Sequence, residues 1–361
     1  MSKITVITPS RLHFALIDLN GSLGRVDGGI GLSITHPGFR ITAQSADETE
    51  VLICGTESKE FSLEKRDRGI LISRTIKILE LLREKCEINN IRIEIEESIP
   101  SHVGLGSGTQ LSLGVAQAVC SLYDLDLNHH EMAFLVERGG TSGIGVATFS
   151  QGGFIVDGGH EFSKDGICED KKRSFLPSSA SKGIKPPPII ARYDFPDWDI
   201  LITIPNCKHI SGEEEVKLFQ TLCPLPLDDV RSISHIILLK LLPATVQHDL
   251  ISFGEAVNII QNLGWKKTEI EKQDEIVKQT MAFLRNNGGY GVGLSSWGPA
   301  IFCFGEDLSL LQNKARDFLT ENNTNGYCFI TRANNFGATV IDENGIYGSR
   351  IETTDLQRSF R

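Results

Sequence analysis

The sequence predicts an α+β protein of two domains, placed at residues 1–195 and 196–361. Three observations support this prediction. The chain has 361 residues, more than the roughly 250–300 at which a single hydrophobic core usually stops growing. Its strand and helix patterns lack the regular alternation of a parallel βαβ sheet. A run without periodicity, SFLPSSASKGIKPPP at 174–188, separates the halves as a linker or a long surface loop.

Alternating apolar and polar residues predict half-buried antiparallel strands in the first half. The predicted strands are KITVIT at 3–8, GFRITAQSA at 38–46 and IRIEIEESI at 91–99. Between the last two, ILISRTIKILELLREKC at 70–86 has the spacing of an amphipathic helix. A buried helix is predicted from Thr109, and another from His129 with Asn128 as its N-cap.

The second half also mixes strands with helices. DWDILITIP at 197–205 predicts a strand, and helical patterns follow through about 220–285. Two more strands, AIFCFGE at 300–306 and GYCFITRA at 326–333, flank the helix DLSLLQNKARDFL at 307–319. This order favours α+β in the second half as well.

Composition argues against several classes of protein. Hydrophobic residues make up 40% and charged residues 23% of the chain, as in ordinary globular proteins. With 36 basic and 46 acidic residues the formal net charge is −10, so nucleic acid is a poor partner. No apolar run approaches the roughly 20 residues of a membrane span and no signal core opens the chain, so we expect a cytoplasmic protein without membrane contact. The eight cysteines form no C-x-x-C pair, which favours reduced thiols over a metal or redox site.

One glycine-rich stretch, SIPSHVGLGSGTQLSLG at 98–114, predicts an anion site. It joins a predicted strand to a predicted helix, so free backbone N–H groups and the positive end of the helix dipole meet at the turn. Gly104, Gly106 and Gly108 let the backbone approach phosphate oxygens, and Ser107 and Thr109 add hydroxyl donors. The spacing fits neither the Walker pattern nor G-x-G-x-x-G. A plain tight strand–helix connection is therefore the alternative.

A second stretch, PSRLHFALIDLNGSLGRVDGGIGLSI at 9–34, places Arg11, His13, Asp18, Arg25 and Asp27 among glycines and apolar residues. Charges are rarely buried unless they are paired. Asp18 and Arg25 flank the turn LNGSLG and could meet in one cleft. The alternatives are a surface hairpin with a structural salt bridge and, for His13, a hydrogen-bonded core histidine.

Three segments together resemble the superfamily of galactokinase, homoserine kinase, mevalonate kinase and phosphomevalonate kinase. They are the strand that opens at Ile4, the glycine loop IPSHVGLGSG, and TSGIGVATFSQGG at 141–153. A further segment, GGYGVGLSSWGPAIF at 288–302, matches the third, C-terminal glycine-rich motif of the superfamily. The resemblance implies a GHMP-kinase-like fold. Its N-terminal domain would resemble domain 2 of ribosomal protein S5, and its C-terminal domain would be ferredoxin-like.

Two residues depart from the kinase motifs. Gly145 stands where many of these kinases carry the aspartate proposed to activate the acceptor hydroxyl. Gly108 replaces the second serine of the kinase loop P-x-x-x-G-L-G-S-S. We therefore expect that the anion site is kept and that phosphoryl transfer is lost.

Four stretches look more specifically like the β-ribofuranosylaminobenzene 5′-phosphate synthases, a branch of this superfamily. They are TPSRLHFALIDLNGSLGRVDGGIGLSI, VERGGTSGIGVATFSQGGFIVDGGH, NCKHISGEEE and GLSSWGP. This resemblance implies an archaeal-type enzyme of methanopterin biosynthesis that joins 5-phosphoribosyl 1-diphosphate to 4-aminobenzoate or 4-hydroxybenzoate and releases carbon dioxide and diphosphate. It also implies Mg²⁺, no organic cofactor, and a glycine loop that holds the phosphates of the ribosyl donor.

The resemblance suggests roles for the polar residues. Arg25 would clamp the carboxylate or the diphosphate, and Asp18 would order Arg25, bind Mg²⁺ or hydrogen-bond the amine. The expected substrate-binding residues are His13, Asp27, Gly104, Gly106, Ser107, Gly108, Thr109, Thr141, Ser142 and Gly143. Trp297 would either stack on the aromatic ring or belong to the core.

Two other functions stay open at this point. One is an ATP-dependent small-molecule kinase, which Gly108 and Gly145 oppose, and the other is a non-catalytic sensor of a phosphate ligand, which the polar cluster at 11–27 opposes. The expected partners are small molecules. A homodimer is the default expectation for a soluble oligomer.

Overall fold

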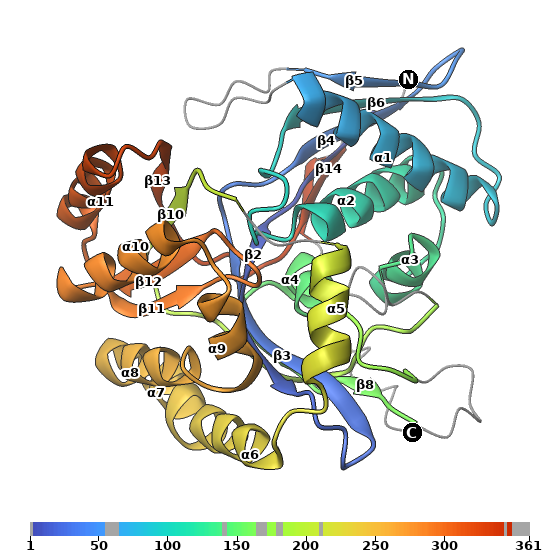
Figure 1. The fold of residues 1–361 in the computed structure, drawn as a ribbon. Coiled ribbons are helices and arrows are strands. Elements are labelled where there is room, and N and C mark those ends of the chain that lie inside the picture. The colour runs from blue at the N-terminus through green and yellow to red at the C-terminus, as the bar shows by residue number, and fades with distance from the viewer. Residues whose placement is uncertain are drawn as a thin grey trace.

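The protein is described by a computed structural model, in which residues 3–54, 65–138, 143–163, 172–177, 183–208, 212–342 and 345–348 are described. Its strands form three sheets (Figure 1). The first sheet has the order β15-β14-β1-β4-β6-β5, and only β5 runs parallel to its neighbour. Its strands are β1 (Lys3–Ile7), β4 (Arg40–Ser45), β5 (Glu50–Ile53), β6 (Ile91–Glu97), β14 (Thr339–Asp342) and β15 (Gly345–Gly348).

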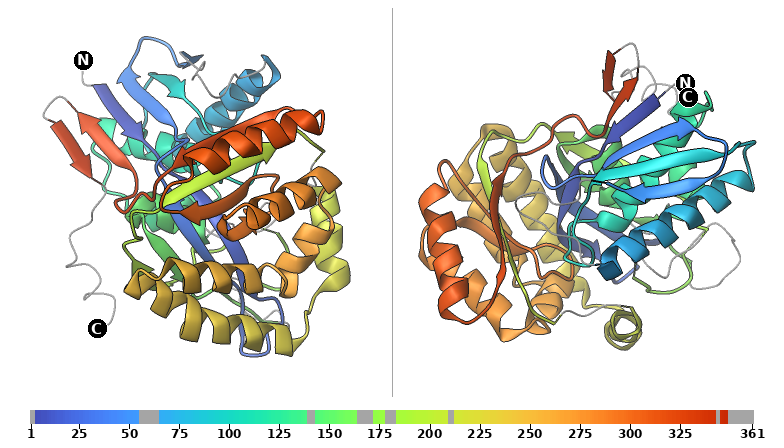
Figure 2. Two further views of the ribbon diagram at one scale, coloured as in Figure 1. Left: turned by 90° about the vertical axis from the view of Figure 1, so that its left-hand side faces the viewer. Right: turned by 90° about the horizontal axis from the view of Figure 1, so that it is seen from above.

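Two helices cover one face of this sheet, α1 (Lys65–Arg83) and α2 (Ser107–Leu122) (Figures 1 and 2). The alternation in β6 explains the packing, because every second residue of Ile91–Ile95 is an isoleucine with no exposure. α2 is apolar on nearly all faces and is buried along most of its length. Helices α3 (His129–Leu135) and α4 (Gly143–Gln151) follow, and Asn128 caps α3 as predicted, with its side chain accepting from the backbone N–H of His130 and Glu131.

The second sheet is built on a long hairpin, β2 (Ser10–Asp18) and β3 (Arg25–Ile34), in the middle of the molecule (Figure 1). β7 (Phe154–Asp157) pairs with the other edge of β3, and β9 (Ile189–Tyr193) pairs with β7. The short β8 (His160–Glu161) pairs with the first residues of β3. The stretch 9–34 is therefore a central hairpin rather than a surface one.

The third sheet, β11-β12-β10-β13, lies between two layers of helices. Its strands are β10 (Asp199–Pro205), β11 (Tyr290–Leu294), β12 (Ile301–Gly305) and β13 (Gly326–Thr331). Apolar side chains of α10 (Glu275–Asn286) and α11 (Ser309–Glu321) pack on one face, and those of α8 (Leu250–Ile260) pack on the other. The remaining helices of this half are α5 (Glu213–Leu222), α6 (Leu227–Ile236), the π-helical turn η2 (Ile237–Leu241), α7 (Leu242–Gln247) and α9 (Gly264–Glu271).

A cluster of phenylalanines joins the hairpin to the third sheet. The ring of Phe14 on β2 stacks on Phe302 of β12 at 4.7 Å between centroids, and meets Phe154 of β7 edge-on at 5.7 Å. Such ring pairs add about 0.5–1.5 kcal/mol each beyond the burial of their area. The main hydrophobic core consequently contains residues of both halves.

The end of the described chain differs from the predicted domain plan. β14 pairs with β1, so residues 339–342 and 345–348 lie in the first sheet rather than with the half 196–361 to which they were assigned. The cause is that β1 offers a free edge whose backbone groups need partners. Of the predicted linker, Leu176 and Pro177 line a pocket, and 178–182 lie outside the described residues.

The structure tests one of the expectations about location. No helix in the described ranges has the length and apolar character needed to cross a bilayer. The expected homodimer and the cytoplasmic location stay predictions.

Candidate functional site

A pocket of about 620 Å³, counting the space at its open mouth, lies beside the β2–β3 hairpin. The polar residues of the lining include Arg11, His13, Asp27, Asp157, His160, Lys172, Glu215 and Glu269. The apolar side consists of Leu16, Leu176, Phe219, Trp265 and Trp297. Charged groups and an aromatic wall in one pocket suit a ligand with both charged and ring-shaped parts.

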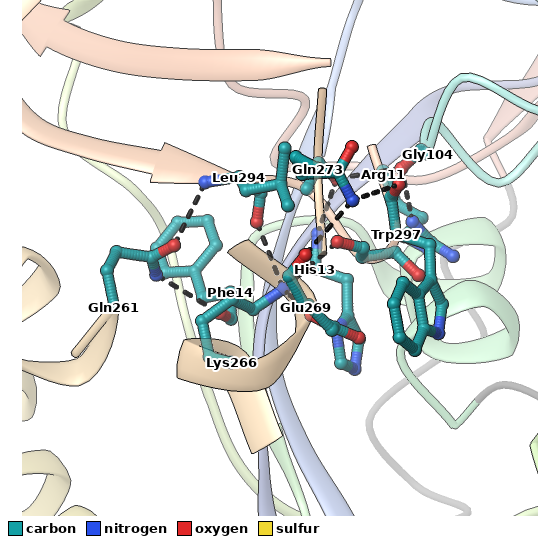
Figure 3. Close-up of polar contacts among 12 residues, drawn as sticks. Arg11, His13, Phe14, Gly104, Gln261, Lys266, Glu269, Gln273, Leu294 and Trp297 are labelled. Atoms are coloured by element: carbon teal, nitrogen blue, oxygen red, sulfur yellow. Dashed lines mark hydrogen bonds and ion pairs between the residues drawn. The ribbon is translucent and has the colours of Figure 1, made fainter. Parts of the chain in front are cut away.

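The glycine loop adjoins this pocket through Arg11. α2 begins directly after Gly106, which has a left-handed backbone with φ of 80° and provides no side-chain cap. The first backbone N–H groups of α2 therefore face the glycine loop. Nη1 of Arg11 donates to the carbonyl of Gly104 at 2.5 Å, and a Cβ on Gly106 would lie 2.8 Å from Cγ of Arg11 (Figure 3). The loop glycines themselves do not line the pocket; Arg11 lies between them and the cavity.

A second guanidinium lies on the first turn of α2. A Cβ on Gly108 would lie only 2.2 Å from Nη2 of Arg138, so the absence of a side chain at Gly108 makes room for that cation. Nε of Arg11 is buried and has no hydrogen-bond partner among the described residues. Two cations and the positive end of a helix thus meet at the predicted anion site.

The electrostatics of the two arginines favour a bound anion. Burial lowers the pKa of Arg11 to about 10, partly opposed by Glu269, and the charge of Arg138 lowers it further. Burial likewise lowers the pKa of Arg138 to about 10, with a further contribution from Arg74. Like charges held together out of water repel each other. An anion with several oxygens would relieve that repulsion and accept several hydrogen bonds.

The other end of the pocket holds a carboxylate with two partners. Asp27, a non-glycine residue with φ of 68°, accepts at Oδ2 from Nζ of Lys172 at 2.8 Å and from Nδ1 of His160 at 2.6 Å. Lys172 also donates to the carbonyl of Leu176. Burial alone would raise the pKa of Asp27, but Lys172 and the hydrogen bond from His160 outweigh it and hold the pKa below its usual value. Asp27 is therefore ionised, and Lys172 is already neutralised.

Between the two ends lie Asp157 and His13. The Cβ position of Gly29 is 3.0 Å from Oδ2 of Asp157 and 3.3 Å from Nε2 of His13, so the two side chains flank the same glycine. Burial raises the pKa of Asp157 to about 7, although the backbone N–H of Gly159 partly stabilises its charge. Burial, Arg11 and Lys266 lower the pKa of His13 well below 6.5, so its imidazole is neutral.

Replacing Asp157 by asparagine is expected to stabilise the protein increasingly as pH rises. The folded pKa of about 7 lies above the ordinary value of 3.8. The Asp157 carboxyl therefore contributes most to the stability of the wild type below pH 3.8, and this contribution is lost as pH rises to about 7. An asparagine side chain cannot ionise, so the melting temperature of Asp157→Asn should rise relative to that of the wild type between pH 4 and 7. Above pH 7 this difference should level off, and the corresponding difference in the free energy of unfolding is on the order of 4 kcal/mol.

A matched control is Asp199→Asn. Asp199 is paired with Arg332 at 2.7 Å, so this change should lower the melting temperature at neutral pH. A pH-independent difference for Asp157→Asn would contradict the interpretation of Asp157 as a buried neutral acid.

The aromatic wall is held by a buried ion pair. Lys266 and Glu269 on α9 form an ion pair with side-chain exposures of 1% and 4%, and Nζ of Lys266 also donates to the carbonyls of Leu294 and Ser296 (Figure 3). Nε2 of Gln273 donates to the carbonyl of Trp297 at 3.1 Å. These bonds fix the turn after β11.

Trp297 lies at the boundary between the two walls. It is buried, meets Trp265 edge-on at 5.8 Å between centroids, and donates its indole N–H to Glu215. Burial and the charge of Glu269 raise the pKa of Glu215 to about 7, and the hydrogen bond from Trp297 opposes this shift. Trp297 is therefore a core residue that also lines the pocket, and its stacking on an aromatic ring stays a prediction.

Two predicted residues lie outside the pocket. Arg25 donates from Nε to the carbonyl of Gly158 at 2.7 Å and from Nη2 to that of Gly159 at 2.6 Å. Oδ1 of Asp18 accepts from the backbone N–H of Asn20 and Gly21 and so closes the hairpin turn. No ion pair joins Asp18 to Arg25, although both are described residues. Their predicted roles remain hypotheses, and neither side chain is among those that line the cavity.

The other predicted residues are distributed as follows. His13, Asp27 and Gly143 line the pocket, and Gly104, Gly106, Ser107, Gly108 and Thr109 form the loop and the first turn of α2. Thr141 and Ser142 lie outside the described residues. The sequence patterns assigned no roles to Arg138, Asp157, His160, Lys172 or Glu215. A signal for three of them was available, because charged residues flank the glycine pairs in VERGG and VDGGH.

The polar residues that the structure describes do not form a preassembled metal centre. Among the described residues, no group of three or more His, Cys, Asp or Glu side chains is arranged to hold a metal ion. The carboxylate of Asp18, the predicted ligand, is engaged by the hairpin turn. A magnesium ion bound mainly by substrate phosphates, with one or two protein carboxylates, remains compatible with the pocket.

Comparison with known families identifies both halves of the chain. The family of GHMP kinases N terminal domains matches residues 72–153, and the family of GHMP kinases C terminal domains matches residues 241–323. The beta-ribofuranosylphenol 5′-phosphate synthase of Methanocaldococcus jannaschii is 42% identical over 334 residues, covering 91% of this chain and 98% of that protein. The protein of the same name from Archaeoglobus fulgidus is 43% identical over 334 residues, covering 92% and 98%.

Solved structures confirm the fold. Phosphomevalonate kinase of Streptococcus pneumoniae superimposes with a TM-score of 0.62 at 12% identity, covering 92% of this chain and all of that one. Mevalonate kinase of Methanococcus jannaschii gives a TM-score of 0.60 at 14% identity, covering 92% and 98%. At such low identities the likeness concerns the α+β two-domain architecture alone.

Proposed function

This chain belongs to the family of the beta-ribofuranosylphenol 5′-phosphate synthases, within the GHMP kinase superfamily, and from that membership we propose a decarboxylating phosphoribosyl transfer. The substrates are 5-phosphoribosyl 1-diphosphate and a benzoate with a 4-hydroxyl or 4-amino group, and the pathway is methanopterin biosynthesis. The observation that carries the proposal is 42% identity across 91% of the chain. The pocket, cationic at one end and aromatic along one wall, is consistent with both substrates.

The diphosphate of the ribosyl donor would bind at the glycine loop. Arg11, Arg138 and the first amide groups of α2 supply donors for its oxygens. As the anomeric C–O bond breaks, negative charge grows on the diphosphate, and groups fixed beforehand stabilise that charge without reorganisation. The ribosyl carbon becomes electrophilic in the same step.

The benzoate ring would lie against the aromatic wall. Trp297, Trp265 and Phe219 are held rigidly by one another, with Phe219 and Trp265 only 4.2 Å apart between centroids. A ring stacked there can direct the carbon that bears the carboxylate toward the ribosyl carbon. Loss of carbon dioxide then restores aromaticity, so no proton has to leave the attacking carbon.

The packing around Gly108 opposes the kinase alternative. In the kinase loop this position carries a serine, whereas here Nη2 of Arg138 lies 2.2 Å from where a Cβ would stand. The second departure, Gly145, lies inside α4, and its carbonyl accepts from Nε2 of Gln110. This segment therefore offers no carboxylate to an acceptor hydroxyl.

We propose that Mg²⁺ reaches the site on the diphosphate, where it would neutralise charge on the leaving group. Glu215 is a pocket carboxylate that could meet it, because the indole N–H of Trp297 occupies only part of its capacity to accept. Chelation with EDTA should therefore stop turnover, and added Mg²⁺ should restore it. The melting temperature of the substrate-free protein should move by less than about 1 °C, because no ion is bound before the substrate. A large shift on chelation would instead reveal a resident metal site.

The direct test supplies 5-phosphoribosyl 1-diphosphate and carboxyl-labelled 4-hydroxybenzoate or 4-aminobenzoate to the full chain without ATP. Release of labelled carbon dioxide with stoichiometric diphosphate is the expected result. Formation of ADP from ATP and an alcohol, without carbon dioxide from the labelled acceptors, would favour the kinase. Binding of the ribosyl donor with neither reaction would favour the sensor.

A further inference from the structure

A buried histidine of the pocket has one ring nitrogen without a hydrogen-bond partner in the described part of the chain. His160 is 6% exposed and lines the pocket. Its Nδ1 lies 2.6 Å from Oδ2 of Asp27, and since an ionised carboxylate only accepts, the hydrogen in this bond is on Nδ1. Nε2 is buried and has no hydrogen-bond partner among the described residues. A neutral His160 therefore presents a lone pair at Nε2.

The charges at this end of the pocket indicate what kind of group can meet Nε2. The ammonium of Lys172, 5% exposed, is neutralised by Asp27 and bonded to the carbonyl of Leu176. The guanidinium of Arg25, on the strand paired with β8, is engaged by the carbonyls of Gly158 and Gly159. Within the described part of the lining, no free positive charge is left there for a phosphate or a carboxylate. The fitting ligand is a neutral group with a hydrogen to donate, such as a hydroxyl or an amine.

Strand register places this end well away from the anion site. Arg11 pairs with Ser33 and Asp27 with Asp18 on the same hairpin, so the two levels are six residues apart along β3, or roughly 20 Å between backbones at about 3.4 Å per residue. Side chains from both levels line the same pocket, so a ligand bound at the anion site can extend toward His160. An acceptor whose carboxylate-bearing carbon faces the ribose would direct its opposite end, the 4-substituent, toward His160.

Resting on the function proposed above, we propose that Nε2 of His160 is the base that accepts the proton of the acceptor's 4-hydroxyl group. As the ring carbon bonds to the ribosyl carbon, the diphosphate leaves with the electron pair of the C–O bond, and the O–H proton moves to Nε2. The C–carboxylate bond then breaks, its electron pair restores the aromatic ring, and carbon dioxide leaves. The phenolate takes the proton back from His160, so atoms and charges balance.

Asp27 makes His160 better suited to this step than the other imidazole of the pocket. The carboxylate of Asp27 stabilises the imidazolium that forms when Nε2 takes a proton, as in other carboxylate–histidine pairs. His13 has no such partner among the described residues; its backbone N–H is bonded to Ser295, and its ring lies near the cations Arg11 and Lys266. A proton on His13 would be destabilised, whereas one on His160 is compensated.

The test compares two acceptors on the variant His160→Asn, whose amide can keep the bond to Asp27 but has no Nε2. A 4-hydroxyl group must release its proton to donate electrons fully to the attacking ring carbon. A 4-amino group donates its lone pair without losing a proton. We expect kcat with 4-hydroxybenzoate to fall about 100-fold or more, kcat with 4-aminobenzoate to fall less than about tenfold, and KM for the ribosyl donor to stay within about threefold. Equal losses with both acceptors, as a ribose contact or a structural role would cause, would overturn the proposal, as would no loss.

Controls separate this proposal from the function on which it rests. His129, also buried but bonded to Gln117 beneath α2, provides a matched variant, and His129→Asn should leave the ratio of the two acceptors unchanged. If His160→Asn does not fold, Asp27→Asn tests the same pair from its other member and should show the same selective loss. Wild-type protein that turns over neither acceptor would refute the proposed function itself, whereas wild-type turnover with an unselective variant refutes only the role of His160.

Discussion

Gly108→Ser, which introduces the serine expected from the kinase loop, should reduce synthase turnover about 100- to 1,000-fold without creating a kinase. A Cβ at this position would stand 2.2 Å from Nη2 and 3.4 Å from Cζ of Arg138, so the guanidinium must move off the first turn of α2. Loss of one fixed donor to a developing anion costs about 100- to 1,000-fold in rate. The measurement is kcat/KM for the ribosyl donor, with an ATP-dependent phosphorylation assay beside it.

The melting temperature keeps this prediction separate from misfolding. The displaced atoms are the far end of a flexible side chain, so the stability of the free protein should change little. Gly114→Ala in the same helix is the matched control, because its Cβ would meet Ile41 and Thr8 in the core at 2.8 and 2.9 Å. That control should lower the melting temperature and leave KM unchanged. Normal turnover by Gly108→Ser would show that Arg138 has no part in the reaction.

Arg11→Met should reduce kcat/KM for the ribosyl donor by about 1,000-fold, because hydrogen bonds to charged groups contribute about 1.5–3 kcal/mol each. The free protein should be nearly as stable as the wild type. The change removes a buried cation whose desolvation and repulsion from Arg138 oppose its attraction to Glu269, and the carbonyl of Gly104 keeps its bond from Oγ of Ser295 at 2.7 Å. Stabilisation by added diphosphate, read as a rise in melting temperature, should disappear in the variant.

Arg192→Met is the control for this substitution. Arg192 on β9 also donates to backbone carbonyls, those of Gln151 and Gly152, but it does not line the pocket. Its loss should lower the melting temperature while KM for the ribosyl donor is preserved. If Arg11→Met still binds diphosphate as tightly as the wild type, the anion site does not lie between Arg11 and α2.

Much of the fold follows from local patterns in the sequence. Ile91, Ile93 and Ile95 alternate with polar residues and form β6, and Asn128 followed by Glu131 forms the capping box that starts α3. The apolar run after Thr109 forms the buried α2. These predictions succeed because strand period, capping and helix burial depend on residues only a few positions apart.

The candidate site was harder to predict because its contacts join distant parts of the chain. Arg25 and Asp18 are close in sequence on opposite strands of a hairpin, yet Arg25 turns to the carbonyls of Gly158 and Gly159, 133 and 134 residues away. The partners of Asp27 are His160 and Lys172, 133 and 145 residues away. No spacing rule reaches across such distances.

The sequence by itself determined the family, the α+β class and the glycine loop at a helix N-terminus. Only the tertiary structure decided which groups meet: the guanidinium of Arg138 lies at Gly108, and His160 and Lys172 bind Asp27. The physical reason is that sequence motifs depend on the local backbone geometry of neighbouring residues. Buried charges, by contrast, are paired by the register of β3 with β7 and β8 and by the packing of helices, and these are set only when the whole core assembles.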